Sequence, residues 1–146
     1  MLYIGSDYAG FDLKTKLVTY LKKQLKLKVE DLGAFEKTED DFVDYAVPVA
    51  KAVAKNEANR GILICDSGHG MNIAANKIKG IRASIGYSIE GAELARTHDN
   101  VNILSLSSRA LTPKHAAAIV KKFLETDFIP LERRIRRMKK IAKLEK

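Results

Sequence analysis

The chain has 146 residues, of which 46% are hydrophobic and 30% are charged; this composition excludes a disordered chain and favours a globular protein. No apolar run approaches the ~18 residues that a membrane span requires, and the first residues lack the basic and apolar regions of a signal peptide. The one cysteine cannot form an intrachain disulfide, so we expect a cytoplasmic protein. The length is that of one compact domain, which we expect over residues 1–146. The net charge of +8 is compatible with a nucleic acid or a small anionic ligand, but much of it lies in residues 133–146, and by itself that distribution favours a solvated terminal helix.

The first half of the chain alternates between strand-like and helix-like segments. We predict strands over residues 2–6, 28–32 and 61–65 and helices over residues 10–25 and 45–55. The polar residues 36–41 read as a loop. The third strand, residues 61–65, is a continuous apolar run, which is typical of a strand buried on both faces.

The second half continues this alternation. We predict helices over residues 71–79, 89–98, 112–124 and 131–146 and strands over residues 81–85 and 101–106. Thr112 followed by Pro113 is typical of a helix N-cap with proline at the first helical position. The whole pattern predicts an α/β protein: a doubly wound, Rossmann-like, five-stranded parallel sheet with a basic helix at the carboxyl end.

Ligands of open α/β sheets bind beyond the carboxyl ends of the strands. In this chain that rule selects Asp7–Tyr8, Cys65–Gly70, Tyr87 and Ser107–Arg109. We therefore expect these stretches to line the functional site.

The most informative stretch is Cys65-Asp66-Ser67-Gly68-His69-Gly70, a predicted strand-to-helix turn. Its glycines let a ligand approach the backbone closely, and N–H groups at a helix start favour an anion. Cys65 is either core filling at a strand end or a functional thiol, and the residue type alone leaves both open. A phosphatase loop is excluded because Met71 stands where an arginine is needed, and neither a P-loop nor a dinucleotide fingerprint is present.

Several segments in the same order resemble one known family. They are residues 5–11, 61–77 (which end in Ile-Ala-Ala-Asn-Lys), 80–83, 95–104 and 133–137. Over nearly its full length the chain is similar to type B ribose-5-phosphate isomerases, whose family also contains galactose-6-phosphate isomerase. The resemblance implies an aldose–ketose isomerase without a metal or another cofactor, acting as a homodimer or tetramer with active sites at the subunit interface.

The resemblance also implies roles for individual residues. The base that removes a proton from C2 of the open-chain sugar phosphate, giving a cis-enediolate, corresponds to Cys65. The hydroxyl of Ser67 then assists proton movement, and His98 together with Asp7 opens the sugar ring. The phosphate-binding arginines correspond to Arg109, Arg133 and Arg137, and further substrate contacts are expected from Tyr8, Asp66, Gly68, His69, Gly70 and Asp99.

Some residues depart from the family pattern, and all of them fall in the expected site. Tyr8 and Arg134 stand where histidine is usual, Asp66 replaces a glycine and Asp99 an asparagine, and residues 106–109 lack the usual glycine. We expect the charge of Asp66 to disfavour a thiolate if its carboxylate points toward Cys65. These changes bear on the preferred sugar and on the level of activity.

Four alternatives to a ribose-5-phosphate isomerase follow from the sequence. An allose- or galactose-6-phosphate isomerase is the nearest, and a weakly active paralogue that only binds a sugar phosphate is the second. A flavodoxin-like signalling domain fits less well, because Asp7 stands alone where an acidic pair is needed and Arg109 replaces a lysine. A nucleic-acid binder fits least, since the basic terminal helix has no interleaved aromatic residues. We expect neither nucleic acid nor membrane as a partner.

Overall fold

The computed structural model describes residues 1–145, in which five strands form one parallel sheet. The strands are β1 (Leu2–Ser6), β2 (Val29–Asp31), β3 (Arg60–Cys65), β4 (Ala83–Ile85) and β5 (Ile103–Ser107). The helices are α1 (Phe11–Lys23), α2 (Val43–Ala54), α3 (His69–Ala75), α4 (Ile89–Asp99), α5 (Pro113–Glu125) and α6 (Glu132–Ala142). The strand order is β2-β1-β3-β5-β4, so the predicted α/β fold with a five-stranded parallel sheet is confirmed.

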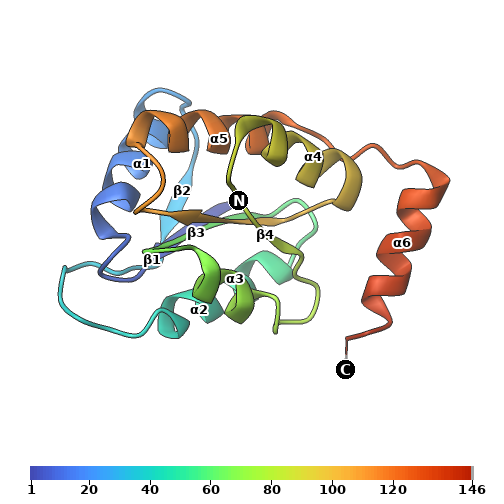
Figure 1. Ribbon diagram of the computed structural model, residues 1–146, viewed down its shortest axis with the longest axis horizontal. Coiled ribbons are helices and arrows are strands. Elements are labelled where there is room, and N and C mark those ends of the chain that lie inside the picture. The colour runs from blue at the N-terminus through green and yellow to red at the C-terminus, as the bar shows by residue number, and fades with distance from the viewer. Residues whose placement is uncertain (146) are drawn as a thin grey trace.

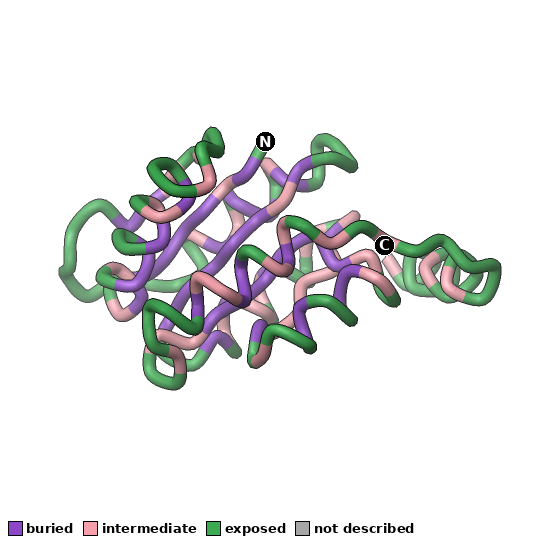
Figure 2. Tube along the Cα trace, turned by 90° about the horizontal axis from the view of Figure 1, so that it is seen from above, coloured by how far each residue is buried: buried purple, intermediate pink, exposed green. Residues whose placement is uncertain are grey.

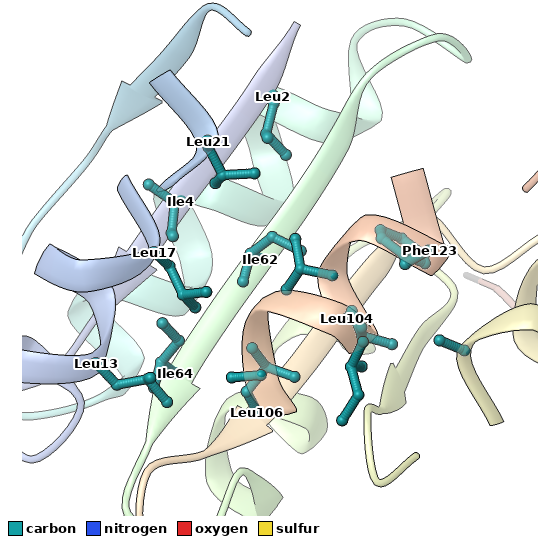
Figure 3. Packing of buried hydrophobic residues seen from close by; sticks show 14 of the residues in the cluster. Leu2, Ile4, Leu13, Leu17, Leu21, Ile62, Ile64, Leu104, Leu106 and Phe123 are labelled. Atoms are coloured by element: carbon teal, nitrogen blue, oxygen red, sulfur yellow. The ribbon is translucent and has the colours of Figure 1, made fainter. Parts of the chain in front are cut away.

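Helices cover both faces of the sheet (Figure 1). α1, α4 and α5 lie over one face and α2 and α3 over the other. Successive side chains of the central strand β3 point to opposite faces of the sheet. Ile62 and Ile64 pack under α1 and α5, while Leu63 and Cys65 pack toward α2 and α3. Figure 3 shows the first of these two clusters. Burial on both faces is the reason that the apolar run of β3 is continuous.

Some boundaries differ from the predicted ones. α3 covers residues 69–75 instead of 71–79, because the side chain of Asn76 turns away to bond both the N–H and the carbonyl of Ala83. β4 begins at Ala83 instead of residue 81, since the N–H of Arg82 donates to the side-chain oxygen of Asn102 and not to the backbone of a neighbouring strand. The N-cap at Thr112 is confirmed: its Oγ1 accepts the N–H of His115 at 3.1 Å.

Two cationic side chains are buried among the described residues. Nζ of Lys14 donates to Oδ1 of Asp31 at 2.8 Å and to the carbonyl of Ala34. The guanidinium of Arg96 donates to the carbonyls of Val101 and Thr126 at 2.6 and 3.0 Å. Burial lowers the pKa of Arg96 to about 10. These pairings satisfy polar groups that would otherwise destabilise the core.

α6 stands beside the sheet, past the edge strand β4 (Figure 1). It has no buried residue, and Figure 2 shows it extending from the buried sheet. Nη1 of Arg134 ties it to the carbonyl of Thr97 at 3.1 Å, and beyond its end Glu145 accepts the N–H of Gly80 at 2.8 Å. The helix predicted over residues 131–146 ends at Ala142, and residue 146 lies outside the described chain. Over the described residues, no helix combines the length and apolarity that a bilayer crossing requires.

Candidate active site

The candidate site lies where the direction of the sheet reverses. From β1 the chain passes through α1 to β2 on one side, then through α2 to β3 on the other side of β1. Such a switch point opens a crevice at the carboxyl ends of the two strands. Because Ser6 is in register with Ile64, Asp7 follows β1 directly beside Cys65 at the end of β3.

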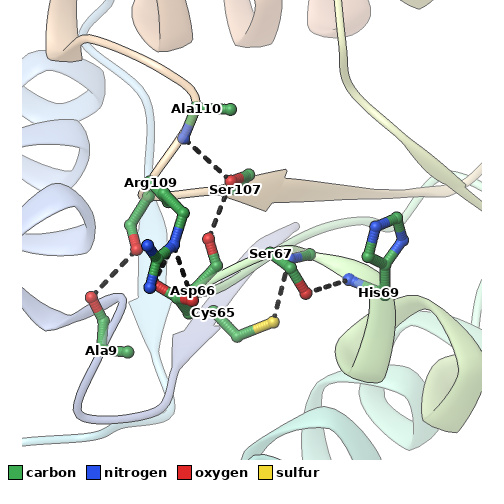
Figure 4. A network of polar contacts seen from close by, with 10 residues as sticks. Ala9, Cys65, Asp66, Ser67, His69, Ser107, Arg109 and Ala110 are labelled. Atoms are coloured by element: carbon green, nitrogen blue, oxygen red, sulfur yellow. Dashed lines mark hydrogen bonds and ion pairs between the residues drawn. The ribbon is translucent and has the colours of Figure 1, made fainter.

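Cys65 aims its sulfur into the loop that follows it. The side chain is buried, and Sγ accepts the N–H of Gly68 at 3.1 Å (Figure 4). In the same loop, Oγ of Ser67 accepts the N–H of His69 at 3.3 Å. A thiol, a hydroxyl and a series of backbone N–H groups thus share one short turn before α3.

The glycines of this turn are required by its shape. Gly68 has a φ of +84°, and a Cβ there would lie 3.2 Å from the backbone carbon of Leu106. The carbonyl of Gly68 accepts Oγ of Ser105 at 2.6 Å, which holds the turn against β5. Gly70 accommodates a neighbouring ring, because a Cβ there would meet Phe42 at 2.8 Å.

Asp66 points away from the thiol. Its carboxylate pairs with Nε of Arg109 at 3.0 Å, and in Figure 4 this pair extends to the opposite side from the sulfur of Cys65. The condition under which Asp66 would oppose a thiolate is therefore not met in this arrangement. Arg109 follows β5, so the loops after β3 and β5 meet in this pair.

Asp7 is buried at the end of β1. Its Oδ1 accepts the N–H of Gly10 at 3.0 Å, which fixes the carboxylate in the turn before α1. Burial raises the pKa of Asp7, the N–H of Gly10 opposes that shift, and the negative charge of Asp40 adds to it. Tyr8 is exposed next to it, and its N–H donates to Asp40 at 3.1 Å.

One chain brings together only some of the predicted site residues. The group at the carboxyl end of the sheet comprises Asp7, Tyr8, Cys65, Asp66, Ser67, Gly68, His69, Gly70 and Arg109. The others lie elsewhere: α4 runs back along the sheet and places His98 and Asp99 near the amino end of β5, where Asn102 accepts the N–H of Gly61. The four residue steps from Gly61 to Cys65 span about 13 Å along β3. Arg133 and Arg137 lie on α6, outside the sheet.

Two residues near the site were missed in the sequence. Asp40 bonds the backbone of Tyr8, and Phe42 lies against Gly70. Both come from the segment that follows β2, which the sequence analysis treated as a polar loop followed by a helix. Ligands bind beyond the carboxyl ends of the strands, and the same rule applied to the end of β2 selects this segment as well.

The chemistry available at this edge is proton transfer and anion binding. It has one thiol, a hydroxyl, a buried carboxylate with a raised pKa and an exposed guanidinium. Across residues 1–145, histidine, cysteine, aspartate and glutamate side chains form no group of three or more that could hold a metal ion.

Comparisons with known proteins agree with this architecture. The family model described as Ribose/Galactose Isomerase matches residues 2–141. A protein of Mycoplasma pneumoniae named "Probable ribose-5-phosphate isomerase B" is 44% identical over 87% of this chain and 84% of its own length. The solved ribose-5-phosphate isomerase B of Clostridium thermocellum is 37% identical, with a TM-score of 0.94 over 98% of this chain and 95% of the other.

A second solved relative has a sugar phosphate bound. It is the ribose-5-phosphate isomerase B of Mycoplasma genitalium with bound ribulose 5-phosphate, 41% identical, with a TM-score of 0.93 over 98% of this chain and 94% of the other. The family model covers the whole sheet and all its connections. The chain belongs to the ribose/galactose isomerase family.

Proposed function

We propose that the protein interconverts ribose 5-phosphate and ribulose 5-phosphate, with Cys65 as the general base. The observation that carries this proposal is the placement of the Cys65 sulfur: it is the one thiol of the chain, and it faces the glycine turn at the switch point of the sheet. The ribulose 5-phosphate bound to the relative from Mycoplasma genitalium supports the same substrate class.

The proposed reaction moves one proton between neighbouring carbons. The thiolate of Cys65 takes the proton from C2 of the open-chain aldose; the C–H electron pair forms the C1–C2 double bond, and the carbonyl pair moves onto O1. Ser67 passes the proton of O2 to O1, which leaves the negative charge on O2. The C1–C2 double-bond pair then takes the proton of Cys65 at C1 while an electron pair of O2 forms the carbonyl at C2, and Cys65 is again a thiolate. The N–H groups of Gly68 to Gly70 stabilise the negative oxygen of the cis-enediolate.

Ring opening precedes that step. It needs one group that gives a proton to the ring oxygen and one that takes the proton of the anomeric hydroxyl. Asp7 is suited to hold a proton because burial raises its pKa. We assign the second proton-transfer group to His98. Within one chain, His98 lies at the opposite end of the sheet from Asp7. Asp99 follows it on the same helix.

The separation of these residues supports a homodimer with shared sites. In this arrangement a second copy supplies His98, Arg133 and Arg137 to the Cys65 of the first, and Arg109 binds the phosphate from the same chain as the thiol. An apolar surface next to the site supports such a contact. Phe42 and Ile73 are exposed by 37% and 61% and line a hollow of about 350 Å³ that reaches Gly70.

The test is turnover of ribose 5-phosphate, allose 6-phosphate and galactose 6-phosphate by the wild type and by Cys65→Ala. We expect ribose 5-phosphate to be the best substrate and the variant to lose ~10²–10⁴-fold in kcat, the range that a general base contributes. Cys65→Ser serves as the size-matched control, since a hydroxyl of similar shape is a far weaker base.

Each other outcome has a definite meaning. Unchanged turnover by Cys65→Ala removes Cys65 from the role of base. Faster turnover of either hexose phosphate than of ribose 5-phosphate identifies the protein as a hexose-6-phosphate isomerase. Binding without turnover of all three sugars by the wild type identifies a sugar-phosphate-binding paralogue.

A further inference from the structure

The pair of Asp66 and Arg109 has a particular geometry. Nε of Arg109 lies 3.0 Å from Oδ2 and 3.3 Å from Oδ1 of Asp66, so a single donor faces both carboxylate oxygens. Both side chains remain open to solvent, with exposed fractions of 53% for Asp66 and 77% for Arg109. The two Nη groups of Arg109 form no hydrogen bond to any residue of the described chain.

The backbone under this pair is fixed on both sides. The carbonyl of Asp66 accepts the N–H of Arg109 at 3.1 Å and Oγ of Ser107 at 2.7 Å. Ser107 in turn accepts the N–H of Ala110 at 3.0 Å (Figure 4). Because the main chains of both loops are locked together, the ion pair restrains mainly the long side chain of Arg109, which otherwise has many rotamers.

We infer that Asp66 is a positioning residue that directs the Nη groups of Arg109 toward the phosphate of the substrate. The inference rests on the proposed function and deepens it. A guanidinium offers five N–H donors on separate edges. Asp66 takes Nε, and the end that carries the two Nη groups stays available for two parallel bonds to a phosphate.

The charge of Asp66 also has an opposing effect, since a carboxylate repels a phosphate. The geometry decides between the two effects. The carboxylate faces Nε, and exposure of both groups to water weakens its repulsion of an anion bound at the far end of the guanidinium. Restraint of Arg109 therefore outweighs repulsion, and removal of Asp66 weakens binding of the phosphate.

Binding is measured in the Cys65→Ala background, so that turnover does not interfere. Isothermal titration with ribose 5-phosphate and with inorganic phosphate gives Kd for the parent, Asp66→Ala and Asp66→Asn. We expect Asp66→Ala to raise both Kd values roughly two- to fivefold, as exposed ion pairs do. Asp66→Asn recovers most of this loss, because its amide oxygen still accepts Nε. In the enzyme that keeps Cys65, Asp66→Ala raises KM more than it lowers kcat.

Two controls isolate the role of the pair. In an Arg109→Ala background, Asp66→Ala has no further effect, as a double-mutant cycle for a coupled pair requires. Glu125→Ala removes the acid of a similarly exposed ion pair on α5, with Lys121, and leaves Kd unchanged.

The inference is overturned if Asp66→Ala binds either probe as tightly as the parent or more tightly, or if its effect persists without Arg109. These outcomes leave the proposed isomerase intact when the wild type turns over ribose 5-phosphate. Absence of both binding and turnover in the wild-type protein overturns the proposed function and this inference together.

Discussion

At the scale of single residues, Asp7 combines burial with a place in the candidate site. Its carboxylate lies in the turn after β1, next to Cys65 in the sheet and close enough to Asp40 to feel its charge. Burial raises the pKa of Asp7, so the fold is destabilised when the group ionises. The contribution of protonated Asp7 to stability is complete below the ordinary pKa of 3.8 and is lost as the pH rises through the raised value.

Asp7→Asn should therefore trade stability against activity. Asparagine keeps an oxygen for the N–H of Gly10 but carries no charge, so the variant should melt at a higher temperature than the wild type at pH 8. This advantage should shrink as the pH falls toward 4. In the proposed role in ring opening, the same change should lower kcat/KM by ~10²-fold. Thermal melts over the pH range and initial rates with ribose 5-phosphate check both parts.

The control for Asp7 is an exposed carboxylate in the first turn of α1. Asp12→Asn removes a charge that is 64% exposed and paired with Lys37. It should change the unfolding free energy by less than about 0.5 kcal/mol at any pH. A pH-independent difference between Asp7→Asn and the wild type would contradict the account of Asp7.

At the scale of elements, the turn between β3 and α3 depends on a backbone that only glycine adopts easily. Gly68 has a φ of +84°, and the carbonyl carbon of Leu106 would lie 3.2 Å from any added Cβ. Its N–H faces the sulfur of Cys65, so the turn and the thiol are set by the same residue. A side chain here shifts the turn and the sulfur together.

Gly68→Ala should lose both stability and activity, and Gly80→Ala gives a matched control. Gly80 has a φ of +86°, but a Cβ added there would meet nothing nearer than the Cβ of Ala54 at 3.9 Å, and Gly80 lies between α3 and β4, away from Cys65. Both variants should unfold more easily by about 1–3 kcal/mol, the strain of a left-handed residue with a Cβ. Only Gly68→Ala should also lose kcat, by roughly tenfold or more, because the donors to the enediolate move.

Urea unfolding and steady-state rates measure the two effects for each variant. If Gly80→Ala loses as much kcat as Gly68→Ala does, the loss reflects general destabilisation and the turn has no special role. Retained kcat in Gly68→Ala would show that the enediolate is stabilised by other donors.

At the scale of the whole molecule, the residues proposed to act in catalysis lie in two separate regions of one chain. The thiol group stands at the carboxyl end of the sheet, whereas His98 and the cations of α6 lie at the amino end and beyond β4. The exposed apolar residues along α2 and α3 lie on the thiol side. A symmetric pair of chains joins these two groups if the partner's α4 and α6 reach across that surface.

Mixing two inactive variants tests this arrangement. We expect Cys65→Ala and the double variant Arg133→Ala/Arg137→Ala each to be nearly inactive. When equal amounts are unfolded together and refolded, half of the dimers contain one chain of each kind, and each such dimer has one intact site. Activity should therefore return to about a quarter of the wild-type value.

Recovery of activity is specific to a shared site. A site contained within one chain leaves every mixed dimer inactive, so an unrestored mixture contradicts the arrangement. Refolding each variant alone is the control for spontaneous recovery, and size-exclusion chromatography measures the oligomer that forms.

Much of the fold could be predicted because its signals are local. The continuous apolar run of β3, the helical spacing of α1 and the Thr112–Pro113 cap each follow from neighbours in sequence. The elements with weaker local signals were placed less accurately. β4 is three residues long because two side chains outside it, those of Asn76 and Asn102, accept the backbone N–H groups of Ala83 and Arg82 at its start.

The sequence by itself determined the class of fold, the thiol at the end of β3 and the likeness to one isomerase family. Only the tertiary structure decided which charged side chains are buried and which groups they pair with. Lys14 and Arg96 sit on helices like many surface cations, yet they are buried because distant carbonyls and a carboxylate converge on them. Asp66 faces Arg109 instead of Cys65 for the same reason: the direction of a side chain depends on groups that the chain brings together from other loops.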